Sequence, residues 1–107
     1  MEALPLRLSP GADLRVALEA EFAARSQRAG FVISGVGSLS GARLRLAGSG
    51  EPVNLRGDLE ILTLAGTVSG NGSHLHMSVA DSEGRVLAVM SRTEASCVPR
   101  PRFYLYY

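Results

Sequence analysis

Residues 58–80 read DLEILTLAGTVSGNGSHLHMSVA and hold both histidines of the chain. Apolar and polar side chains alternate on either side of the turn-forming Gly70-Asn71-Gly72. The stretch therefore predicts a strand over 58–68 and a second strand over 74–80. Successive side chains of a strand point to opposite faces. The pattern places His74 and His76 on one face with Ser78, and the apolar residues between them on the other.

A single helix is predicted near the start of the chain. Apolar residues recur there at helical spacing: Leu14, Ala17, Leu18 and Phe22. The spacing predicts a helix from about residue 12 to 28, begun by Pro10 or Asp13 and ended by Gly30. The charged residues on the other side indicate a solvated surface: Arg15, Glu19 and Glu21.

Further strands are predicted over residues 4–8, 31–39, 42–46 and 85–90. The glycines within 31–39 predict bulges or close approach of the backbone. The fold class is α+β, with one main helix and a strongly curved, mostly antiparallel sheet.

Composition predicts one small domain over residues 1–107. The chain is 46% hydrophobic and 20% charged, and its net charge is +1, which attracts neither DNA nor acidic membranes strongly. The lone cysteine, Cys97, excludes an internal disulfide and is typical of a reducing cytosol. Residues 1–8 lack the pattern of a signal peptide, and no apolar run reaches about 18 residues. We expect a cytoplasmic protein that is not bound to membranes.

The histidine pair has three interpretations: a metal pair, an acid/base pair, or two ordinary surface residues. Imidazoles suit zinc, but zinc needs three or four ligands, so His74 and His76 form only half of a site. Ser73, Ser78 or a histidine of a neighbouring subunit would substitute only in part.

Three other features have a functional and a structural interpretation. Glu60, in an otherwise apolar stretch, is either a catalytic base or, as we prefer, a surface or interface residue paired with an arginine such as Arg56. Gly35-Val36-Gly37 lacks the rest of a phosphate-binding loop and indicates structural glycines. Arg43 and Arg45 share a strand face, which favours a solvated surface over a track for phosphates.

Five segments, in order, resemble the plants-and-prokaryotes-conserved (PPC) domain over about residues 6–87. They are Leu8-Ser9-Pro10-Gly11, Ser34-Gly35-Val36-Gly37-Ser38, residues 59–67 (LEILTLAGT), Gly72-Ser73-His74-Leu75-His76 and Asp81-Ser82-Glu83-Gly84. The resemblance implies an α+β domain that assembles as a homotrimer. Plant members join it to AT-hooks. Bacterial members are stand-alone domains that are called DNA-binding by that analogy, and some carry a metal at the histidines.

Residues 88–107 form an atypical tail. The family pattern continues after residue 87 with Gly-Gly-His, whereas this chain reads AVMSRTEASCVPRPRFYLYY and lacks a third histidine. If one G is restored after the Leu87 codon, codons exist for residues 88–102 that read GGHVADGGVVRTAAE. Our hypothesis is a frameshifted tail, which sequencing of the coding DNA would test. We expect it to lack the final strand, to leave a sheet edge unpaired, and to expose the terminal Phe103-Tyr104-Leu105-Tyr106-Tyr107.

Together these observations predict a homotrimeric module that binds a small ligand or a metal, zinc being the candidate. His74 and His76 form the centre of its site, and Glu60 and Ser78 are supporting residues. The first alternative is a DNA-binding accessory protein. The second is a zinc-dependent enzyme, which would need a third ligand to hold a reactive water. No catalytic residue set stands out in the sequence, so we favour a binding role over an enzymatic one.

Overall fold

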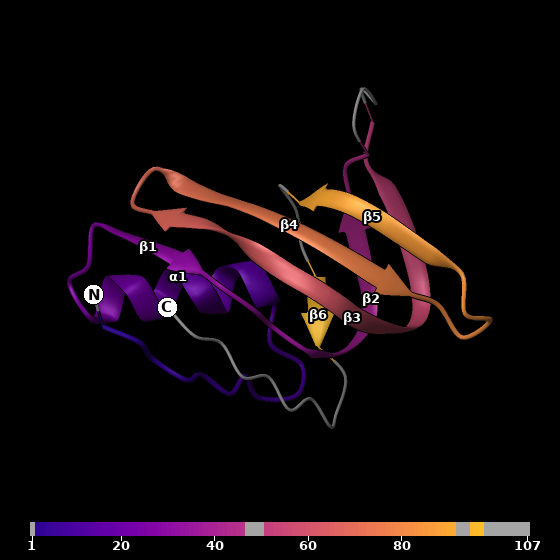
Figure 1. The fold of residues 1–107 in the computed structure, drawn as a ribbon, viewed down its shortest axis with the longest axis horizontal. Coiled ribbons are helices and arrows are strands. Elements are labelled where there is room, and N and C mark those ends of the chain that lie inside the picture. The colour runs from indigo at the N-terminus through magenta and orange to yellow at the C-terminus, as the bar shows by residue number, and fades with distance from the viewer. Residues whose placement is uncertain (1, 47–50, 92–94, 98–107) are drawn as a thin grey trace.

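The computed structural model describes residues 2–46, 51–91 and 95–97, and the side chains of residues 2–46 and 51–87 (Figure 1). It consists of one helix and a mostly antiparallel sheet. The terminal aromatic run and the segments 92–94 and 98–107 of the predicted frameshifted tail lie outside the described residues. No helix in the described ranges is long and apolar enough to span a membrane.

The helix α1 spans Leu14–Ala24 and is shorter than predicted. Asp13 caps its start, because its carboxylate accepts a hydrogen bond from the backbone N–H of Val16 at 2.9 Å. The helix ends well before Gly30, and Ser26 then turns the chain with a φ of 54°. Leu14, Leu18 and Phe22 are buried as the spacing predicts.

The strands are β1 (Ala29–Val32), β2 (Gly37–Leu44), β3 (Val53–Ser69), β4 (Gly72–Ala80), β5 (Val86–Ser91) and β6 (Ala95–Cys97). Their order in the sheet is β5-β4-β3-β2-β6, and β1 pairs with the end of β3 beyond β2. The long β3 therefore holds β4 along one edge, and β2 followed by β1 along the other. The predicted hairpin of β3 and β4 is confirmed.

Two bulges interrupt β3. Opposite β2, the single residue Ser40 faces both Gly57 and Asp58, and Gly57 has a positive φ of 94° that suits a glycine. Opposite β4, Leu62 is the extra residue between the pairs Ile61–Val79 and Thr63–Ser78. Leu62 and Thr63 are consequently both exposed.

The prediction of a strongly curved sheet is wrong. The observed sheet is mostly antiparallel and not strongly curled. The glycines expected to bend a strand over 31–39 lie between strands instead. β1 ends at Val32 and β2 begins at Gly37, so residues 33–36 form a connection. β2 then joins parts of the two predicted strands, 31–39 and 42–46. Residues 4–8 form no strand either, although Leu6 and Leu8 are buried.

The tail contributes a strand, contrary to prediction. β6 pairs antiparallel with β2 over Leu39–Cys97, Gly41–Ser96 and Ala42–Ala95. The polar groups of a sheet edge accept a partner backbone whatever side chains it carries. An alternating pattern is therefore not required of so short a strand.

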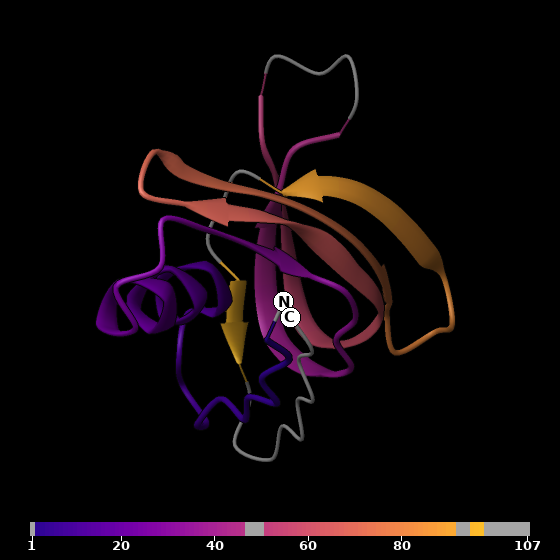
Figure 2. The same cartoon turned by 60° about the vertical axis from the view of Figure 1, so that its left-hand side comes forward.

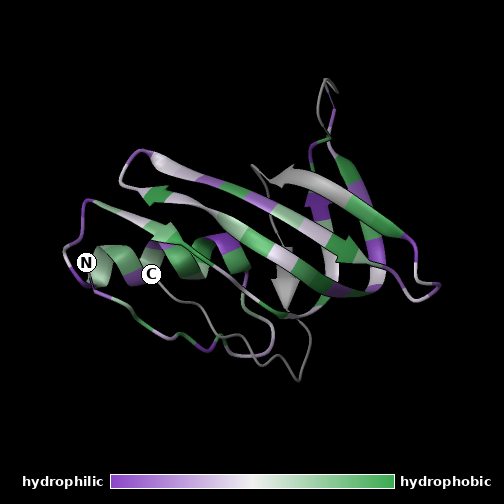
Figure 3. Cartoon of the chain, viewed as in Figure 1, coloured by the Kyte–Doolittle hydropathy of each residue, from purple (hydrophilic) through white to green (hydrophobic). Residues whose placement is uncertain are grey.

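Helix α1 lies against one side of the sheet (Figures 1 and 2). The side chains that the helix and the sheet turn toward each other form one core. Apolar colour alternates along β3 and β4 in Figure 3, which matches the buried residues Leu64, Val68, Leu75, Met77 and Val79. Gly30 contributes by its lack of a side chain, since a Cβ there would collide with the ring of Phe22. Helix α1 covers one face of the sheet, and none of the described elements covers the opposite face (Figure 2).

Candidate functional site

Both histidines lie on the uncovered face of the sheet. His74 and His76 are exposed on β4, and the alternating Ser73, Leu75 and Met77 are buried. Paired residues of antiparallel strands share a face, so the pairing extends this face across the sheet. His74 is opposite Thr67 on β3, which is opposite Phe31 on β1. His76 is opposite Ala65.

Large apolar side chains surround the histidines on this face. Phe31 is 53% exposed and Val86 is 59% exposed, and Ile33 and Leu62 are also exposed. Val86 belongs to the same face because it is opposite Ala80. Ala80 is four residues from His76 on β4, so the two residues share a face of the strand. Monomeric proteins rarely expose so many apolar side chains together. We call this set, Phe31, Ile33, Leu62 and Val86 with the two histidines, the histidine face.

The predicted supporting residues lie near this face but have other partners. Ser78 shares a hydrogen bond of 2.6 Å with the hydroxyl of Thr63. Glu60 is exposed and lies opposite Ala80. Its carboxylate accepts a hydrogen bond of 3.0 Å from the hydroxyl of Ser38, and no ion pair with Arg56 is found among the described residues. Our preferred interpretation of Glu60 as a surface residue agrees with this exposure. Ser73 points to the core, away from the face that carries the histidines, and its hydroxyl bonds to Glu19.

One register position on β5 completes the geometry of the histidine pair. The backbone of Met90 is directly opposite His76. Directly opposed residues of an antiparallel pair have Cβ atoms about 4.5–5.5 Å apart, and successive same-face residues on one strand are about 7 Å apart. The backbones of residues 76 and 90 therefore lie directly across the ladder from each other.

The described residues do not form a complete metal site. No cluster of three or more histidine, cysteine, aspartate or glutamate residues occurs among them. Two imidazoles supply half of the ligands that zinc requires. A metal at this pair needs a further ligand from outside the described part of one chain.

A second polar group joins the helix to the start of β4. Ser73 is only 3% exposed, and its hydroxyl donates a hydrogen bond of 2.8 Å to Glu19 Oε1. The same oxygen accepts a hydrogen bond of 3.0 Å from Arg15 Nε. Partial burial alone would raise the pKa of Glu19, but the bonds from Ser73 and Arg15 and the charge of Arg15 outweigh it and lower the pKa. Arg15 and Glu19 are thus not merely a solvated surface.

This group borders a polar cavity of about 430 Å³ at the β3–β4 turn. We call it the hairpin cavity. Its lining residues are almost all polar: Arg15, Thr67, Ser69, Asn71, Gly72, Ser73 and His74. Sequence reasoning missed it, because it interpreted Arg15 and Glu19 as a solvated surface. Their four-residue spacing, which suits an ion pair, is a signal that could have drawn attention to them. Their approach to Ser73 depends on tertiary packing.

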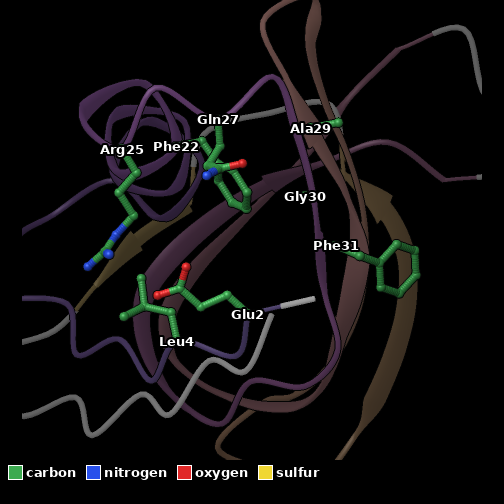
Figure 4. Close-up of a pocket in the computed structure, with 8 residues that line it drawn as sticks. All are labelled: Glu2, Leu4, Phe22, Arg25, Gln27, Ala29, Gly30 and Phe31. Carbon is green, nitrogen blue, oxygen red and sulfur yellow. The ribbon is translucent and has the colours of Figure 1, made fainter.

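A larger cavity of about 630 Å³ lies between the end of α1, β1 and the N-terminal segment (Figure 4). Leu4 and Phe22 point into it, while the ring of Phe31 points to the other side of β1 (Figure 4). Its described lining residues include Arg25 and Gln27 but no histidine, cysteine or serine. Apart from the carboxylate of Glu2, the described lining offers no nucleophile, and it offers no set of metal ligands.

Comparison with known proteins gives a consistent result. The model of the Plants and Prokaryotes Conserved (PCC) domain, the family abbreviated PPC above, matches residues 1–98. Over 81 residues, 76% of this chain, the sequence is 52% identical to the bifunctional protein GlmU of Synechococcus sp. strain JA-3-3Ab. The match spans only 13% of that longer protein.

Solved structures match the fold over nearly the whole chain. A hypothetical protein from Salmonella enterica has a TM-score of 0.89 at 30% identity, over 98% of this chain and 75% of that one. The metal-containing protein AF0104 from Archaeoglobus fulgidus has a TM-score of 0.79 at 26% identity, over 98% and 79%. A Bacteroides thetaiotaomicron protein proposed to bind DNA has a TM-score of 0.82 at 19% identity, over 98% and 76%, which shows the fold alone.

Proposed function

This chain belongs to the Plants and Prokaryotes Conserved domain family, and from that premise we propose that it is a binding module whose histidine face holds a metal or a small ligand. The observation that carries the proposal is the exposure of His74 and His76 side by side on a face rich in exposed apolar residues. The metal-containing Archaeoglobus protein, with the same fold, supports a metal ion as the ligand. The Synechococcus protein contains its matching segment as a small part of a long chain, which suits a module.

We further propose that the histidine face is buried between three copies of the chain. Exposed apolar residues on an otherwise uncovered sheet are typical of subunit interfaces. Assembly through this face would also bring histidines of neighbouring copies toward each other. A further ligand for a metal held by His74 and His76 would then come from a second subunit.

Zinc titration of the metal-stripped protein by calorimetry tests the site. We expect weak, saturable binding that His76→Ala abolishes. Met90→His should tighten zinc binding by at least about tenfold, because it places a third imidazole opposite His76. The same variant restores, at position 90, the histidine of the Gly-Gly-His sequence that the proposed frameshift would have removed.

Val16→His is the matched control for the added histidine. Val16 is 60% exposed but lies on α1, away from the histidine face. We expect this variant to bind zinc like the wild type. Equal zinc binding by the wild type and the double variant His74→Ala/His76→Ala would refute a metal site at this pair.

The second candidate function, DNA binding, is favoured by arginines on the β2–β3 hairpin. Arg43 is opposite Asn54 and Arg56 is opposite Gly41. Arg45 follows Arg43 by two residues, so the three arginines share the outward face of the hairpin. All three are exposed, although Asp58 and Glu51 are exposed close by in sequence.

Salt-dependent binding to an A·T-rich duplex tests this alternative. The near-neutral net charge predicts weak affinity, in the range of about 10⁻⁴–10⁻⁶ M that is typical of non-specific binding. If the hairpin binds phosphates, Arg45→Gln/Arg56→Gln should lower the slope of log affinity against log salt by about 0.9 for each phosphate that is no longer neutralised. Arg25→Gln, on the helix, serves as the charge-matched control. Equal slopes for all variants would rule out the hairpin as the DNA-binding surface.

A further inference from the structure

We propose that Asn71 is a site of spontaneous deamidation, at which the side-chain amide is converted to a carboxylate by reaction with the backbone of Gly72 and then with water. Asn71 precedes Gly72 at the tip of the hairpin that β3 and β4 form. The inference goes beyond the proposed binding function and does not rest on it. The modified chain carries one more negative charge, which cancels its net charge of +1.

The reaction has two steps. The backbone nitrogen of Gly72 attacks the side-chain carbonyl carbon of Asn71 and closes a succinimide ring. The amide nitrogen of Asn71 leaves as ammonia and takes the proton that Gly72 has lost. Water then opens the ring at either carbonyl, returns a proton to the nitrogen and supplies the new carboxylate oxygen. One opening gives aspartate, and the other gives isoaspartate, in which the main chain runs through the former side chain.

The fold keeps the attacking nitrogen accessible. Gly72 has a φ of 113°, a conformation that residues with a side chain rarely adopt. The turn therefore requires a glycine here, and no Cβ stands beside the nitrogen. The pair Ser69–Gly72 is also the last of the β3–β4 ladder. Ladder ends open at almost no cost in free energy, so the N–H of Gly72 is released without unfolding of the hairpin.

The side chain of Asn71 is exposed and has room to turn toward this nitrogen. Among the described residues its side-chain amide has no hydrogen-bond partner, and its backbone N–H donates to the hydroxyl of Ser69 at 3.3 Å. Asn71 also lines the hairpin cavity, whose volume of about 430 Å³ gives the amide space to rotate. Rotation of the amide therefore breaks no hydrogen bond within the described part of the chain.

The other asparagine of the chain is an internal control. Asn54 is exposed as well, and its side chain has no hydrogen-bond partner in the described ranges. It is followed by Leu55, however, whose side chain stands beside the nitrogen that would attack. Asn54 also lies opposite Arg43 within the β2–β3 ladder, with a paired residue on either side. Asn54 should therefore keep its amide far longer than Asn71.

Mass spectrometry tests the inference on folded protein that has been aged under mildly alkaline conditions and then digested with trypsin. Cleavage after arginine places Asn54 in the peptide 46–56 and Asn71 in the peptide 57–85. We expect the mass of 57–85 to rise by the difference between an amide and an acid, as two products that chromatography separates. Asn71 should react at least about tenfold faster than Asn54, which requires a difference of only about 1.4 kcal/mol in barrier height. A sample digested before ageing corrects for deamidation during digestion.

Asn71→Gln is the matched variant. Glutamine keeps the amide, but its longer side chain has to close a larger ring, so the peptide 57–85 of this variant should hold its mass. Asn71→Asp carries the charge of the product, and it should elute from an ion-exchange column with the aspartate form of the aged wild type. Circular dichroism of the aged wild type and of both variants verifies that the fold is retained.

Equal rates at Asn71 and Asn54 in the folded protein would overturn the proposal. A peptide 57–85 that changes mass only when the protein is aged in urea would overturn it as well, because the folded turn would then protect the amide. A mass increase of the Asn71→Gln peptide at the wild-type rate would place the reaction at another residue and would equally contradict the proposal.

Discussion

Gly66 has no side chain at a point where the neighbouring strand leaves no room for one. It lies on β3 with a φ of 149°, and a Cβ there would collide with the carbonyl oxygen of His74 on β4. The backbone that carries the histidines therefore depends on a glycine across the ladder. An apparently featureless residue thus determines how closely β3 approaches the site.

Gly66→Ala should lower the free energy of unfolding by about 1–3 kcal/mol from backbone strain alone. The measurement is urea denaturation followed by circular dichroism. Gly70→Ala is the control, since no atom lies within 4 Å of a Cβ at Gly70. Its effect should stay within about 0.5 kcal/mol. Similar stability of the two variants would show that β4 shifts freely to accept a side chain at position 66.

At the scale of elements, the helix and the β3–β4 hairpin are joined by one carboxylate. Glu19 accepts hydrogen bonds from Arg15 on its own helix and from Ser73 on β4. Its pKa is lowered in the folded protein from the usual 4.5. A lowered pKa means that this contribution to stability is present above the unfolded pKa and is lost as pH falls through the folded pKa.

Ser73→Ala should therefore destabilise the protein most near neutral pH. It removes a hydrogen bond that favours the ionised Glu19, so the difference in unfolding free energy from the wild type should shrink as pH falls below about 4.5. Urea denaturation at several pH values measures this difference. Ser82→Ala, an exposed serine in the β4–β5 turn, is the control and should show no such trend. A difference that is constant with pH would mean that Ser73 acts through packing alone.

The elements also show which features were predictable from the sequence. The burial of Leu14, Leu18 and Phe22, and the hairpin with its two outward histidines, follow from local periodicity. The end of the helix does not, because Gly30 makes room for Phe22 in the tertiary fold and does not end the helix. The extra residue Leu62 breaks the alternation of β3, and the position of residue 90 opposite His76 depends on long-range register.

At the scale of the whole molecule, the arrangement is one helix on one face of a sheet whose other face is uncovered by any described element (Figure 2). The buried core is on the helix side. The histidine face carries four of the seven large apolar side chains that are exposed in the described part of the chain. This asymmetry is why we propose that a complete particle contains more than one copy.

Val86→Glu should lower the mass of the assembly, because it places a charge in the proposed interface. Light scattering coupled to size-exclusion chromatography should give three times the 11.3 kDa chain mass for the wild type and less for the variant. Val16→Glu is the control. Val16 is 60% exposed, as Val86 is 59% exposed, but it lies on α1. A wild type that runs as a monomer, or equal losses in both variants, would contradict the proposed interface.

The bulge at Leu62 also has a consequence for how this protein can change by deletion. Before the bulge, even-numbered residues of β3 such as Glu60 face outward, and after it odd-numbered residues such as Thr63 and Thr67 do. If Leu62 were deleted, outward and inward side chains would alternate without interruption along the whole of β3. One half of the strand would then have to turn its outward side chains into the core. Relatives should therefore conserve the count of residues between Glu60 and Thr67 more strictly than their identities.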